Sequence, residues 1–249
     1  MTSTLFLGFV ATMAAVVVAL IARYFNRRAA LRVLAGLSVW FTYVGLVGYF
    51  GVVKNTAMRP PGIAFLVVPV LLFLLLFTVI VIRSPVGARL ALAVPLWIML
   101  GTQSFRIGVE LFLHQLWIDN LVPKMLTFDG ANVDIYIGAS AALIAWLSTR
   151  GRWGMRLALA WNMLGLLALT NVVIRAVLTA PGPFNLIHAE VPNRMMGTFP
   201  FLFIPGFFVP LAVVLHALAI RAIRTQLSTT ISKAVSVDGV EPETGGPVG

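Results

Sequence analysis

Long apolar runs alternate with short polar loops along most of this chain. A helix needs about 20 residues to cross about 30 Å of hydrocarbon, and seven runs reach or approach that length. They cover residues 5–22, 31–53, 62–82, 90–117, 133–147, 157–179 and 199–220. The fifth run is the shortest, and the fourth carries its polar residues at one end. The pattern predicts an all-α, polytopic integral membrane protein, a bundle of about seven transmembrane helices.

The basic residues indicate how this bundle is oriented. Short cytoplasmic loops of membrane proteins are enriched in Lys and Arg. If the first loop is cytoplasmic, the opposite side holds only Lys54, Arg59, Lys124 and Arg194. The basic residues on the first side are Arg23, Arg27, Arg28, Arg32, Arg83, Arg89, Arg150, Arg152, Arg156, Arg221, Arg224 and Lys233. We therefore expect the N-terminus outside and the C-terminus in the cytoplasm, in a cell (inner) membrane.

Composition agrees with a lipid-embedded protein. Of 249 residues, 60% are hydrophobic and 10% charged, whereas soluble domains carry about 25% charged residues. The net charge of +10 follows the predicted loops, so it indicates topology and not a nucleic-acid partner. The chain has no cysteine, which excludes disulfides, thiol nucleophiles and thiolate metal sites.

The two ends of the chain differ in character. Residues 1–4 carry no basic side chain before the first apolar run, so this run is predicted to be a retained helix and not a signal peptide. From about residue 226 the chain is rich in Ser, Thr, Gly and Pro. We expect a transmembrane domain over 1–225 and a disordered cytoplasmic tail over 226–249.

Two seven-helix families share this expected plan, and the residues match neither. Microbial rhodopsins need a lysine near the middle of the last helix, whereas Lys54, Lys124 and Lys233 all lie outside the predicted spans. Sugar-efflux transporters have matching prolines in paired helices, and here the first, second and fifth runs contain none.

The fourth run carries a polar stripe. Gln103, Arg106, Glu110, His114 and Trp117 fall on one face of a helix with 3.6 residues per turn. Charged groups at membrane depth are costly and commonly mark functional sites. Arg106 and Glu110 could bind a ligand near the outer side, or they could form an ion pair within one helix.

A second polar stripe lies on the sixth run. Asn171 and Arg175 are four residues apart, and an arginine at this depth needs a partner, for which Glu110 and Asp134 are the candidates. Asp134 could instead interact with the dipole of the helix that it opens. Asn162 is interpreted as a contact between helices, and His216 as a hydrogen-bonded packing residue.

The outer loop before the last run contains His188 and Glu190 among three prolines. We expect an ordered lid over the bundle, with a solvated loop as the alternative. Together with Glu110 and His114 these side chains could suit a metal ion. No paired-histidine motif is present, so no metal ligand is assigned.

Three functions remain open from the sequence. The first is the binding or transport of a small molecule, which could be anionic, in a polar pocket on the outer side. The second is a membrane-embedded enzyme for a lipid-like substrate, with Glu110 and His114 as an acid–base pair. The third is a structural or assembly role for buried ion pairs.

The predicted ligand-binding residues are Arg106, Glu110, His114, Asp134, Asn171, Arg175 and His188. The expected partners are the lipid bilayer and a small-molecule ligand. Catalytic residues, cofactor and oligomeric state do not follow from the sequence.

Overall fold

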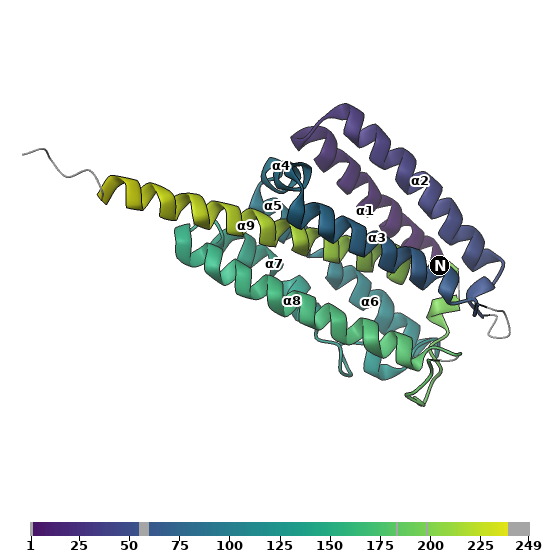
Figure 1. Cartoon of the computed structure of the whole chain (residues 1–249). Helices are drawn as coiled ribbons and strands as arrows, with labels where there is room; N and C mark the ends of the chain where they lie inside the picture. The colour runs from purple at the N-terminus through teal and green to yellow at the C-terminus, as the bar shows by residue number, and fades with distance from the viewer. Residues whose placement is uncertain (1, 55–59, 183, 198, 239–249) are drawn as a thin grey trace, which may run out of the picture.

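The computed structural model describes residues 2–54, 60–182, 184–197 and 199–238, and this part of the chain forms helices and no strands (Figure 1). The helices are α1 (Thr2–Tyr24), α2 (Arg27–Tyr49), α3 (Ala64–Arg83), α4 (Pro85–Ala93), α5 (Leu96–Thr102), α6 (Phe105–Ile118), α7 (Asp134–Leu147), α8 (Gly151–Thr179) and α9 (Val209–Asp238). A π-helical turn, η4 (Ile204–Phe208), leads into α9.

The bundle is built from membrane-type helices. Five helical segments in the described residues are long and apolar enough to cross a membrane, and α4 to α6 provide a sixth if they are counted as one bent span. Helix α7 is apolar but has 14 residues, which reach about 21 Å at about 1.5 Å per residue. The prediction of an all-α membrane-type protein is confirmed, whereas the count of seven spans is not.

The predicted fourth span is broken. Its first part, α4, meets the α5–α6 segment at an angle of 80°. The break falls at Val94, which is extended, and Pro95, because a proline disfavours helical geometry in the residue before it. Upstream, Ser84 caps α4 by accepting a hydrogen bond from the Gly87 N–H at 3.0 Å. A second interruption, at Gln103 and Ser104, separates α5 from α6, so one predicted helix becomes three.

The last helix extends beyond the predicted domain boundary. α9 continues past residue 226 to Asp238 and projects from the bundle (Figure 1). The first part of the expected disordered tail is thus helical, and residues 239–249 lie outside the described part of the chain.

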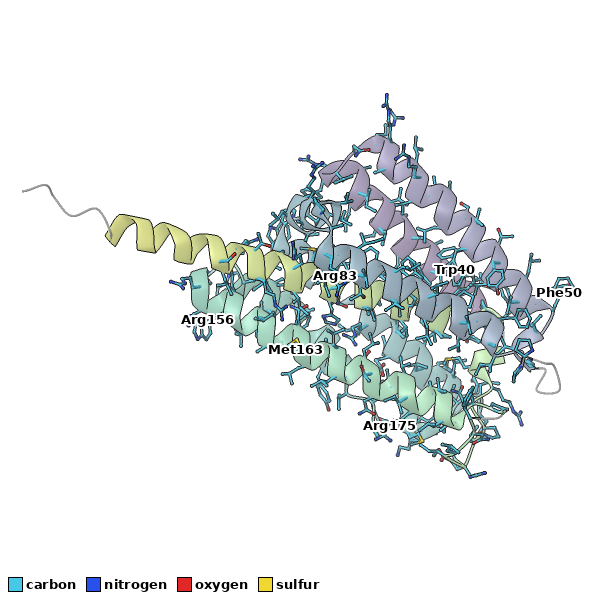
Figure 2. The ribbon with its side chains drawn as sticks, in the orientation of Figure 1. Trp40, Phe50, Arg83, Arg156, Met163 and Arg175 are labelled. Atoms are coloured by element: carbon cyan, nitrogen blue, oxygen red, sulfur yellow. The ribbon has the colours of Figure 1, made fainter. Side chains whose placement is uncertain are left out.

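The turns that carry most of the arginines in the described loops lie at one end of the bundle. The α1–α2, α3–α4 and α7–α8 turns lie at one end, which carries Arg83 and Arg156, whereas Phe50 and Arg175 lie toward the other (Figure 2). Arg221 strengthens the basic end, where its Nη1 donates to the Ile82 carbonyl at 2.9 Å. A cation suits the free carbonyls at the C-terminal end of a helix.

Two proline positions explain how α2 is held against the bundle. Pro69 and Pro210 have no N–H, so the carbonyls four residues earlier, at Phe65 and Gly206, lose their usual helical donor. The Tyr43 hydroxyl donates to the Phe65 carbonyl at 2.5 Å. The Trp40 indole N–H donates to the Gly206 carbonyl at 2.7 Å. Both donors come from α2, and their rings stack with centroids 5.4 Å apart.

We expect Trp40→Phe to destabilise the protein through the unpaired Gly206 carbonyl. A buried acceptor without a partner costs about 1–3 kcal/mol. Reversible unfolding in detergent, followed by helical circular dichroism, measures the loss. In a Pro210→Ala background the residue 210 N–H is restored, so the same Trp40→Phe change should cost much less. An equal cost in both backgrounds would contradict this role of the indole.

Candidate functional site

A buried ion pair joins α6 to the start of α7. Arg106 Nη2 lies 2.6 Å from Asp134 Oδ1, and Arg106 Nε donates to Asp134 Oδ2 at 2.9 Å. Arg106 is 2% exposed, and this two-bond geometry is the strongest that an arginine and a carboxylate can adopt. Arg106 therefore pairs with Asp134 across two helices and not with Glu110 within its own helix.

The same guanidinium also reaches α8 and α9. Arg106 Nη1 lies 3.0 Å from His216 Nε2, and Nη2 donates to the Gly165 carbonyl at 3.3 Å. A guanidinium has only donors, so His216 Nε2 accepts and its Nδ1–H donates to Asn162 Oδ1 at 2.8 Å. A Cβ on Gly165 would lie 2.5 Å from the His216 ring, so glycine is what permits this contact.

Glu110 belongs to a second group of buried hydrogen bonds next to the contacts of Arg106. The two groups together are called the polar core. Glu110 Oε1 accepts a hydrogen bond from Asn132 Nδ2 at 2.6 Å, while Asn132 Oδ1 accepts from the Asp134 N–H at 3.0 Å. Glu110 is 1% exposed, and its Oε2 is buried without a hydrogen-bond partner among the described residues. Unsatisfied buried polar atoms are rare in proteins and call for an explanation.

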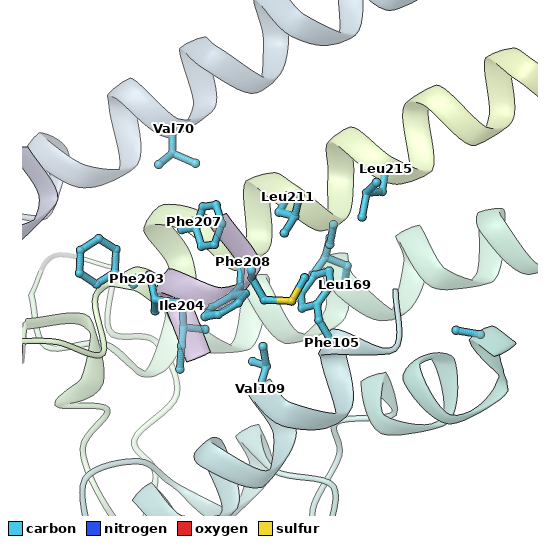
Figure 3. Packing of buried hydrophobic residues seen from close by; sticks show 14 of the residues in the cluster. Val70, Phe105, Val109, Leu169, Phe203, Ile204, Phe207, Phe208, Leu211 and Leu215 are labelled. Atoms are coloured by element: carbon cyan, nitrogen blue, oxygen red, sulfur yellow. The ribbon is translucent and has the colours of Figure 1, made fainter. Parts of the chain in front are cut away.

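An apolar cavity of about 340 Å³ adjoins this polar core. Arg106, Glu110 and Asp134 form its polar wall, and the rest is almost entirely hydrophobic. The apolar lining includes Leu66 and Val70 of α3, Phe105 and Val109 of α6, Leu169 and Val173 of α8, and Ile204 and Phe208 of η4 (several labelled in Figure 3). A cavity of this size falls within the usual range of small-molecule sites.

The cavity reaches the apolar outside of the bundle. Its lining includes Leu71 of α3 and Phe184 of the loop after α8, which are 58% and 54% exposed. Leu72 on α3 and Ile174 on α8 are also exposed, outside the cavity lining. The cavity therefore opens to the surface of the bundle at Leu71 and Phe184.

The structure brings together only part of the predicted site. Arg106, Glu110 and Asp134 meet at the cavity. His114 instead lies 3.6 Å from Asp129 and stacks on Phe128, outside the lining. His114 was predicted from the sequence to bind the ligand together with Arg106 and Glu110, but its contacts lie away from the cavity.

The predicted residues on α8 and the outer loop also lie elsewhere. Arg175 Nε donates to Asn171 Oδ1 on its own helix at 2.5 Å, and neither lines the cavity. His188 is exposed on the loop. The loop is nevertheless tied down, because Glu190 Oε1 accepts from the Lys124 N–H at 2.8 Å. Within the described residues no three His, Asp or Glu side chains gather as metal ligands would.

Three contributors to the polar core were not among the predicted site residues. Asn162 and His216 do form the expected contact between helices, but their link to Arg106 comes from tertiary packing. Asn132 lies two residues before Asp134 in a segment that reads as a helix cap, and its bond to Glu110 crosses to another helix. No local spacing in the sequence signals either contact.

We expect Asp134→Asn and Arg106→Met each to destabilise the fold strongly. Removing one partner of a buried pair leaves the other charge uncompensated, at a cost of about 3–5 kcal/mol. The double variant Arg106→Met with Asp134→Leu should lose much less than the sum of the two single changes. Unfolding free energies in detergent measure the coupling, and strictly additive losses would show that the pair is not energetically linked.

Comparison with known proteins places the chain in a family. No curated protein and no solved structure is detectably similar to it. One family model, described as a domain of unknown function (DUF8737), matches residues 60–224. The match includes α3 to α8, the cavity residues of those helices and the α9 residues that contact Arg106. The chain belongs to this DUF8737 family.

Proposed function

We propose that this integral membrane protein binds a small apolar or amphipathic molecule that enters its cavity from the bilayer. The observation that carries the proposal is the apolar cavity of about 340 Å³ with exposed rim residues and Glu110 in its wall. Apolar walls with a few convergent polar groups are typical of small-molecule sites.

The contacts of Arg106 argue against an anionic ligand, although the sequence left that option open. Its guanidinium donates to Asp134, His216 and the Gly165 carbonyl, so an anion would have to displace the Asp134 carboxylate. Arg175 lies outside the cavity lining. The cavity is therefore better suited to a ligand without negative charge.

The two other candidate functions are less well supported. An acid–base pair needs both groups within reach of one substrate, and Glu110 lines the cavity whereas His114 does not. A structural role accounts for the Arg106–Asp134 pair. It leaves unexplained the cavity beside that pair and a buried Glu110 oxygen that has no partner in the part of the chain that the structure describes.

We also propose that the basic end of the bundle faces the cytoplasm and that the protein lies in a cell (inner) membrane. The gathering of Arg23, Arg27, Arg83, Arg150 and Arg156 near one set of turns supports this orientation, because cytoplasmic loops carry an excess of positive charge. The exposed lining residue Phe184, in the loop after α8, then lies toward the outer side.

Val173→Trp is expected to fill the cavity and abolish ligand binding. Native mass spectrometry of the detergent-purified protein should show a bound small molecule that is lost in this variant. Leu164→Trp is the matched control, because Leu164 is exposed on the same helix and outside the lining. Equal occupancy of a bound molecule in Val173→Trp and wild type, or no bound molecule in any form, would overturn the proposal.

The orientation has a direct test, because the chain contains no cysteine. Asp119→Cys and Thr149→Cys place single exposed thiols at opposite ends of the bundle. In intact cells a membrane-impermeant maleimide should label residue 119 and spare residue 149 until the cells are lysed. Labelling of residue 149 alone in intact cells would reverse the proposed topology.

A further inference from the structure

We propose that the ligand of this cavity carries a protonated amine, which binds the free carboxylate oxygen of Glu110. The inference rests on the proposed function and names the chemical class of its ligand: a single apolar chain or ring system that ends in an ammonium group.

The hydrogen bonds of Glu110 leave one position open. Asn132 Nδ2 occupies Oε1 at 2.6 Å, which holds the carboxyl group in place. Oε2 is buried without a partner in the described part of the chain, and Glu110 lines the cavity. A group in the cavity that donates a hydrogen bond to Oε2 would therefore give the second carboxylate oxygen of Glu110 a partner.

The charges around the cavity are also unbalanced. Three charged residues form its polar wall: Arg106, Asp134 and Glu110. Arg106 is paired with Asp134 through two hydrogen bonds, and its third nitrogen contacts His216. Glu110 has no ion-pair partner among the described residues. An ionised carboxylate in apolar surroundings is costly unless it is paired, and a cationic group in the cavity would pair with Glu110.

An ammonium group fits this position better than other polar ends. A carboxylate or phosphate would face Glu110 and Asp134, and among the described lining residues the one cation, Arg106, is already paired with Asp134. A hydroxyl could donate to Oε2, but a charge-assisted hydrogen bond is roughly twice as strong as a neutral one. Phe105, Phe184 and Phe208 also line the cavity, and aromatic faces attract cations.

The test compares three ten-carbon probes that differ only in their polar end: decylamine, decanol and decanoate. Binding is measured by native mass spectrometry of the full chain in nanodiscs of neutral phosphatidylcholine. In the wild type, decylammonium should bind at least about 10-fold more tightly than decanol, which corresponds to about 1.4 kcal/mol, and decanoate should bind weakest.

Glu110→Gln should remove the preference for the amine while decanol still binds, which also shows that the variant is folded. Glu110→Asp keeps the charge and should retain part of the preference. Asp129→Asn is the matched control, because Asp129 lies beside His114 and outside the cavity lining, and it should behave as wild type.

Two results would overturn the inference. If decanol binds as tightly as decylammonium in the wild type, or if Glu110→Gln keeps the preference, the site binds apolar chains without recognising an amine, and the proposed function survives. If none of the probes binds to any form, the inference fails together with the proposed function.

Discussion

The Arg106–Asp134 ion pair is the interaction on which the arrangement of this bundle depends. A charge in an apolar interior is tolerated only when it is paired and hydrogen-bonded. Arg106 meets this condition by bonding to the start of α7, to the Gly165 carbonyl of α8 and to His216 of α9. One side chain of α6 thus connects four helices. Arg106 lies on α6, which follows the break at Pro95, and Asp134 is the first residue of the short helix α7.

The cavity lies where this polar core meets helices that are interrupted. Pro205 and Phe208 of the π-helical turn line it, together with α3, whose own Pro69 interrupts the helical hydrogen bonds. Backbone groups freed by prolines must find other partners in a medium without water, and Trp40 and Tyr43 of α2 supply them. The aromatic contacts of α2 therefore support the wall of the cavity from outside it.

Much of the fold could be predicted from the sequence, and less of the site. Apolar run lengths and the distribution of arginine predicted membrane-type helices and the gathering of basic turns at one end. The break at Val94–Pro95 was missed, because the hydropathy of residues 90–117 stays high through it. The charged residues of α6 and of the start of α7 gave Arg106, Glu110 and Asp134 as candidate site residues, but with Glu110 and Asp134 as possible partners of Arg175, which instead bonds to Asn171. Helix periodicity fixes which residues share a face but not which helices adjoin, so the pairing of Arg106 with Asp134, the bond of Asn132 to Glu110 and the separation of His114 from the cavity could not be derived.

The cavity beside Glu110 is proposed to receive an apolar chain from the bilayer. The most direct measurement is photo-crosslinking of the reconstituted wild type with a decylamine that carries a diazirine at its chain end, followed by mass-spectrometric mapping of the adducts. Adducts are expected on lining residues such as Val70, Val109 and Val173, and excess unlabelled decylamine should suppress them. Adducts confined to outward-facing positions such as Leu72, Leu75 and Leu164, without competition, would contradict the proposal.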